Sequence, residues 1–157
     1  MARLPLLCLL LVLTASLALA ALPCKTREEA MAEAVVGFFL VQRIAAERCD
    51  EHHGGEAFRA LHRRLEQQYG PQVTQAGTVR AAYFTRAYGE QGAAELRGVD
   101  ALLTELLSAQ LVVNDESCAG LKAELGKRLQ DGWEPIRARL ARRVDAVPGH
   151  DANRCAE

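Results

Sequence analysis

The sequence predicts an all-α fold, a bundle of four or five helices in up-down order that is stapled by disulfides and follows a cleaved signal peptide. Three observations lead to this prediction. Apolar residues recur at steps of three or four along most of the chain, and the alternation typical of strands is absent. Four cysteines follow an apolar N-terminal segment, and an even number in an exported chain is typical of disulfides. The stretch from Ala34 to Val41 is apolar on every side, which indicates a central helix packed on more than one face.

Residues 1–20 have the pattern of a signal peptide. Arg3 supplies the positive start, Leu6 to Ala20 is almost unbroken Leu, Val and Ala, and Ala18-Leu19-Ala20 matches the small-x-small rule for cleavage. The apolar stretch is short and no cluster of stop-transfer charges follows it, so we expect cleavage and no stable membrane insertion afterwards. Residues 21–157 are then a single helical domain in the periplasm or the medium.

The first helix is expected over residues 26–48. Thr26 and Glu29 have the spacing of a capping box, in which each side chain accepts a hydrogen bond from the backbone of the other residue. Residues 50–55 are polar and end in glycine, so we expect a loop there. The apolar residues of this helix recur at helical spacing: Met31, Val35, Phe38, Ala45 and Cys49.

The next segment, residues 56–88, is expected to form two helical pieces that run on as one kinked arm. Pro71 suits the first position of the second piece, where its missing N–H costs no hydrogen bond. If residues 72–88 instead formed an independent helix, the bundle would contain five. A further helix is expected to end near residue 112, and its apolar row is Leu96, Val99, Leu103 and Leu106.

The last segment has the most regular pattern in the chain. Apolar residues advance by three or four at every step from Cys118 to Val147, which predicts one long helix. Pro135 falls inside this row and should kink the helix by removing a backbone hydrogen bond. Asp131-Gly132 leaves a hairpin as the alternative.

The helix lengths restrict the disulfide pairing. If residues 26–48 form one helix, its ends lie about 34 Å apart, whereas a disulfide needs Cα atoms within about 7 Å. Cys24 therefore cannot pair with Cys49, and an unbroken last helix excludes Cys118 with Cys155 in the same way. Four up-down helices favour Cys24–Cys155 and Cys49–Cys118. A fifth independent helix would instead give Cys24–Cys118 and Cys49–Cys155.

Metal-ligand residue types gather after the first helix, where Cys49 is followed closely by His52 and His53, and His62 could approach from the next helix. Against a metal site, Cys49 is expected to be oxidised, and adjacent histidines point in different directions on most backbones. We therefore expect a solvated loop, with no metal and no cofactor.

The charge balance and the motifs exclude several functions. The chain carries 19 basic and 20 acidic residues, and aromatic platforms are absent, so nucleic-acid binding is not expected. No nucleophile elbow, phosphate loop, zinc-protease motif or haem motif occurs. By exclusion, the sequence favours a non-enzymatic exported protein that binds a partner protein, as an inhibitor, immunity protein, accessory subunit or holdase-like factor.

The alternative is a small exported all-α enzyme or ligand-binding protein that holds an anionic small molecule between helices. Guanidinium groups bind carboxylates and phosphates by paired hydrogen bonds, and the candidates are Arg43, Arg80 and Arg86. The alternative requires that one of them points, unpaired, into a cavity. The arginines between residues 137 and 143 are assigned to a solvated helix end, where the helix dipole favours cations.

Overall fold

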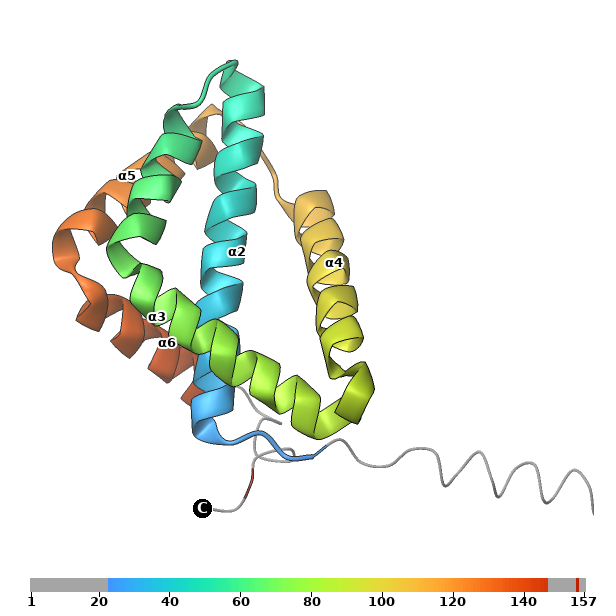
Figure 1. The fold of residues 1–157 in the computed structure, drawn as a ribbon. Coiled ribbons are helices and arrows are strands. Elements are labelled where there is room, and N and C mark those ends of the chain that lie inside the picture. Colours follow the sequence, from blue (N-terminus) through green and yellow to red (C-terminus); the bar gives the residue numbers. More distant parts are fainter. Residues whose placement is uncertain (1–22, 147–154, 156–157) are drawn as a thin grey trace, which may run out of the picture.

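The computed structural model describes residues 23–146 and Cys155, and the signal-peptide segment, residues 1–20, lies outside this part. The described residues form helices and no strand, which confirms the all-α prediction (Figure 1). Within residues 23–146, no helix is long and apolar enough to span a membrane. The elements are α2 (Arg27–His53), α3 (Ala57–Tyr88), the short 3-10 helix η1 (Gly89–Gln91), α4 (Gly92–Gln110), α5 (Asp115–Asp131) and α6 (Trp133–Ala146).

The helices are arranged around α2, which stands at the centre of Figure 1. α3 returns along α2 and crosses it, and these two helices form the most extensive contact in the molecule. α4 rises on one side of α2, whereas α5 and α6 lie on the other. The main core lies between α2, α3, α5 and α6, and its buried aliphatic and phenyl side chains include Val35, Phe39, Leu65, Leu125, Ile136 and Leu140.

The start of α2 is as expected, but its end is not. Thr26 Oγ1 accepts a hydrogen bond from the Glu29 amide at 3.1 Å, and Glu29 Oε2 accepts one from the Thr26 amide at 2.8 Å. The helix then continues to His53, where Gly54 ends it in the left-handed conformation with φ 72°. The prediction of a polar loop after Cys49 is therefore wrong, because residues 50–53 form the last turn of α2.

Asp50 explains this extra turn. It is only 2% exposed, and its two carboxylate oxygens accept hydrogen bonds from the backbone amides of Phe58 and Arg59, each at 2.9 Å. The side chain of Glu56, the residue that precedes α3, makes no capping hydrogen bond. The first amides of a helix need an acceptor from outside, so the last turn of α2 caps α3.

The kinked arm is confirmed in α3. Tyr69, two residues before Pro71, has non-helical angles of φ −114° and ψ 16°, and the helix continues on both sides of this kink. The Tyr69 hydroxyl donates a hydrogen bond to the backbone carbonyl of Arg128 at 2.9 Å, which ties the kink to α5.

The prediction of a single last helix is wrong. The chain breaks at Gly132, with φ 83° and ψ −175°, and turns sharply between α5 and α6 (Figure 1). Pro135 therefore lies in the first turn of α6, where its missing N–H costs no helical hydrogen bond. The apolar row continues across the break because Leu125 and Ile136 face the same core from two different helices.

Two disulfides close the structure. Cys24 pairs with Cys155 at a Cα separation of 4.9 Å, and Cys49 pairs with Cys118 at 5.6 Å. These are the pairs that the up-down order favours. The Cys155 amide also donates a hydrogen bond to the Lys25 carbonyl at 3.1 Å, so the last described residue is held beside the start of α2.

Candidate functional site

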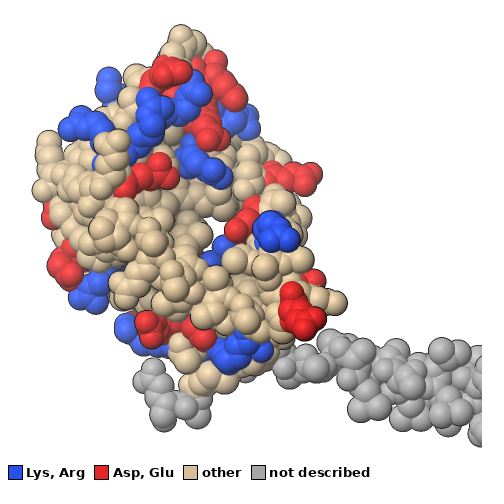
Figure 2. All heavy atoms as spheres, in the orientation of Figure 1, with Lys and Arg blue, Asp and Glu red and all other residues tan. Residues whose placement is uncertain are grey.

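A cavity of about 480 Å³ lies between α2, α4 and α6. Figure 2 shows a hollow between the part of the surface that α4 forms and the body of the molecule. Its volume falls within the range of small-molecule sites, about 300–1,000 Å³. The walls are apolar on all three helices, with Phe38, Leu40, Leu103, Leu107, Ile136 and Leu140 as the large side chains.

The cavity exposes residues of α2 that were expected in the core. Phe38 is partly exposed and lines the cavity, whereas its neighbour Phe39 is buried. Gly37 also lines the cavity, and a Cβ atom built on it would meet nothing within 4 Å. This face of α2 is therefore open rather than packed.

The cavity exists because α4 is held by a few contacts along its length and not by continuous packing. At its start, Gly92 lies so close to α3 that a Cβ atom would be 2.6 Å from the Phe84 carbonyl oxygen. Farther along, Asp100 accepts a hydrogen bond from Arg80 at 2.6 Å. Near the end of α4, Arg48 donates to the Ser108 carbonyl at 2.6 Å. Gly92 is the only buried residue of this helix.

Three arginines line the cavity, and two of them share a single carboxylate. Arg128 and Arg139 both donate to Glu124 Oε1, the second at 2.8 Å. No carboxylate among the described residues pairs with Arg143, the third arginine. The lining therefore carries an excess of positive charge.

Arg128 is the most buried of the three, with an exposed fraction of 8%. Its guanidinium carbon lies 4.5 Å from the centre of the Phe38 ring. Burial lowers its pKa, Glu124 opposes this effect, and the charges of Arg139 and Arg143 lower the pKa further. Among the described residues its buried Nε has no acceptor, and the buried Gln42 Oε1 has no donor. Each such unpaired group costs about 1–3 kcal/mol.

The arginines that the sequence singled out do not form this site. Arg43 is exposed on α2 and does not line the cavity. Arg80 is buried but paired, with Glu33 at 3.0 Å and Asp100 at 2.6 Å. Arg86 contacts Glu29 at 2.7 Å and the backbone carbonyl of Cys24 at 3.1 Å.

Sequence reasoning did not bring the three arginines of the cavity together. Arg139 and Arg143 were assigned to a solvated helix end, and both are exposed as expected, but they also line the cavity. The burial of Arg128 could have been predicted, because Arg128 lies three residues after Leu125, which is fully buried, on the same face of α5.

The predicted metal candidates are only partly brought together. His52 and His53 lie exposed at the end of α2, beside Asp115 at the start of α5. Cys49 is in a disulfide, and His62 is buried elsewhere, with Nε2 3.2 Å from the Phe39 carbonyl oxygen. Burial lowers the pKa of His62.

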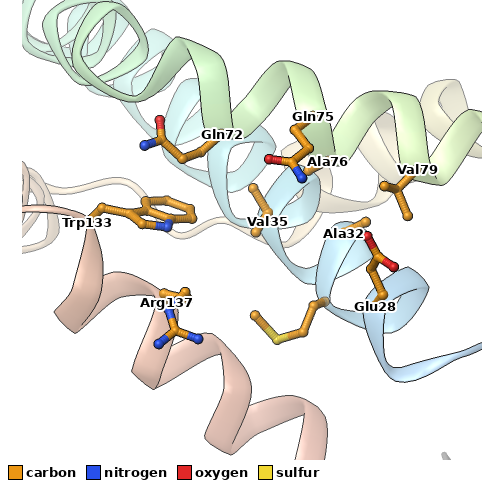
Figure 3. A pocket seen from close by; sticks show the side chains of 10 residues that line it. Glu28, Ala32, Val35, Gln72, Gln75, Ala76, Val79, Trp133 and Arg137 are labelled. Atoms are coloured by element: carbon orange, nitrogen blue, oxygen red, sulfur yellow. The ribbon is translucent and has the colours of Figure 1, made fainter.

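A second, smaller cavity of about 200 Å³ lies between α2, α3 and α6. Figure 3 shows the Trp133 ring directed toward Val35, with Gln72 and Arg137 on either side. The Oε1 atom of Gln72 is buried without a donor among the described residues. Arg137 is paired with Glu134 at 2.9 Å, so this cavity has no comparable excess of positive charge.

The chain matches no protein-family model, no curated protein and no solved structure.

Proposed function

We propose that this protein is a non-enzymatic exported binding protein, and that it holds an amphiphile with an anionic head group in the cavity between α2, α4 and α6. One observation carries the proposal: apolar walls meet three arginines, of which Arg128 and Arg139 share Glu124 and Arg143 pairs with no carboxylate among the described residues. This is the second of the two functions that the sequence indicates, with a different set of arginines.

The walls suit an aliphatic chain. Leu103 and Leu107 of α4 face the α2 side of the cavity, and Leu140 of α6 closes it. Each methylene group that leaves water for such a surface contributes about 0.8 kcal/mol. A purely apolar ligand would gain this energy but would leave the positive charge uncompensated.

The arginines suit the head group. The buried Arg128 Nε has no acceptor among the described residues, and Arg143 has no carboxylate partner there. An anionic oxygen would accept charge-assisted hydrogen bonds from the exposed Arg143, and these bonds are about twice as strong as neutral ones. The buried Arg128 would add the attraction of its positive charge. Next to the Phe38 ring, solvent screening is reduced, which strengthens the attraction.

We also infer that the protein works outside the cytoplasm, in the periplasm or secreted. Two disulfides support this location, because such bonds persist in oxidising compartments. The signal-peptide pattern of residues 1–20 supports it as well.

The test is a calorimetric titration of the exported, disulfide-bonded protein with dodecanoate, dodecyl phosphate and dodecanol, each below its aggregation concentration. We expect the two anions to bind and dodecanol to bind at least about tenfold more weakly, since a charge-assisted hydrogen bond contributes about 1.5–3 kcal/mol. Comparison of the two anions identifies the preferred head group.

Arg143→Gln should weaken binding of the anions about tenfold for the same reason. Arg142→Gln is the matched control, because Arg142 is exposed on the same helix and does not line the cavity. Equal binding of dodecanol and dodecanoate would contradict the proposed role of the arginines.

A second candidate is the binding of a partner protein as an inhibitor, immunity protein, accessory subunit or holdase-like factor. The observation that favours it is the apolar surface on and just after α4, where Leu102, Leu106 and Val112 are 55%, 46% and 75% exposed. Exposed apolar residues grouped in this way are typical of contact surfaces. Failure of all three amphiphiles to bind would favour this second function.

A further inference from the structure

We propose that the junction between α2 and α5 binds one divalent transition-metal ion, Zn²⁺ or Cu²⁺, through His52, His53 and Asp115. This site lies outside the amphiphile cavity, and its residues are not among those that line it. A test of the metal site is therefore independent of a test of the proposed function.

The three side chains already converge on one point. Nε2 of His52 lies 3.0 Å from Asp115 Oδ1, and Nε2 of His53 lies 3.9 Å from the same oxygen. One potential ligand atom from each residue lies within 4.8 Å of the other two. Zinc bonds of about 2.0–2.2 Å in tetrahedral geometry separate ligand atoms by about 3.3–3.6 Å. Small rotations of exposed side chains would therefore close the site.

The disulfide between Cys49 and Cys118 places the ligands opposite each other. His52 and His53 follow Cys49 by three and four residues in α2, so they lie on the face of the helix that carries this cysteine. Asp115 precedes Cys118 by three residues in α5 and shares its face. With a Cα separation of 5.6 Å at the disulfide, the histidines and the carboxylate must meet.

The ring of His53 is oriented by a second contact. It stacks on the buried Phe58 of α3, with ring centres 5.6 Å apart and planes inclined by 16°. Adjacent histidines normally diverge on a helix, but here both rings lie on the side of α2 that faces Asp115, with their centres 4.9 Å apart.

The donor set fits the proposed ions. Two imidazole nitrogens and one carboxylate oxygen are ligands that Zn²⁺ and Cu²⁺ accept. All three residues are exposed, so an ion enters from solvent without any opening of the fold, and water fills the remaining coordination positions. A bound ion would replace the hydrogen bond between His52 and Asp115.

The experiment uses the untagged, disulfide-bonded protein after removal of metal with a chelator. Titration with Zn²⁺ and Cu²⁺ should show one ion bound per chain and a rise in melting temperature, because an ion that binds only the folded state stabilises it. Asp115→Asn should lower the affinity at least about tenfold, the scale seen when metal sites lose supporting groups. Glu116→Gln, at the neighbouring exposed carboxylate, should leave it unchanged.

His53→Gln provides a second variant, because Asp115 lies in the first turn of α5 and its loss could weaken that helix. Circular dichroism verifies that both variants are folded. Absence of saturable binding would overturn the proposal. So would an affinity for both ions that neither Asp115→Asn nor His53→Gln changes.

Discussion

At the scale of single residues, Asp50 joins two helices with one carboxylate. It accepts hydrogen bonds from the amides of Phe58 and Arg59 and from Arg59 Nε, the last at 3.0 Å. Burial by itself would raise the pKa of Asp50, but the hydrogen bonds and the Arg59 charge outweigh burial and lower it below the usual value for an aspartate. The ionised form therefore stabilises the fold.

Asp50→Asn should lower the free energy of unfolding by about 1–3 kcal/mol at neutral pH, because a buried charge-assisted network is lost. Since the folded-state pKa of Asp50 is depressed, this stabilisation is present above its unfolded pKa and is lost as the pH falls through the folded-state pKa. Urea midpoints of both proteins, measured at pH 7 and at a series of acidic pH values, should therefore converge as the pH falls.

Glu51→Gln is the matched control, because the Glu51 side chain is 73% exposed and makes only a surface ion pair. It should change stability by less than about half a kcal/mol. A difference between wild type and Asp50→Asn that stays constant across this pH range would contradict the role of the carboxylate.

Arg80 shows why the site could not be assigned residue by residue from the sequence. Its partners Glu33 and Asp100 lie 47 and 20 residues away along the chain, and no local spacing predicts that they meet. Arg80 was therefore considered as a ligand-binding residue, whereas the structure uses it to hold α4 against α2 and α3.

At the scale of elements, the features of a helix that depend on neighbouring residues were predictable from the sequence. The capping box at Thr26 and the kink before Pro71 follow from side chains within three residues of each other, and both occur in the structure. The break at Gly132 was not predictable from periodicity. A turn that keeps the same faces of α5 and α6 toward the core leaves the apolar row unbroken.

Gly132→Ala should lower the free energy of unfolding by about 1–3 kcal/mol, because φ 83° with ψ −175° is a region that almost only glycine adopts. Gly126→Ala is the matched control in α5, where the helix is regular and a Cβ atom meets nothing within 4 Å. It should raise stability by about 0.5–1 kcal/mol. Guanidinium unfolding at constant slope compares the two variants. A stability gain in both would show that α5 and α6 form one continuous helix.

At the scale of the whole molecule, the packing around α2 is uneven. On one side, α3, α5 and α6 form the main core, and on the other α4 is held by a few contacts, at Gly92, Asp100 and Ser108. The leucines of α4 form an apolar row at helical spacing in the sequence. Whether they meet a partner helix depends on the distance between helices, which the sequence pattern does not contain. The cavity and the arginines that line it are therefore evident from the structure but not from the sequence pattern.

The central claim about the molecule is that the cavity between α2, α4 and α6 is a binding site. Gly37 lines it and leaves open space, so Gly37→Leu should fill part of the volume without disturbing the fold. Gly77→Leu is the matched control, at a helical glycine of α3 with equally open surroundings that does not line the cavity.

The most direct measurement is the affinity of both variants for dodecanoate by calorimetry. We expect Gly37→Leu to bind at least about tenfold more weakly than wild type, because the four-carbon leucine side chain should displace at least about two methylene groups of the ligand, each worth about 0.8 kcal/mol. Gly77→Leu should bind as wild type does. Equal affinity of Gly37→Leu and Gly77→Leu would show that dodecanoate does not bind between α2, α4 and α6.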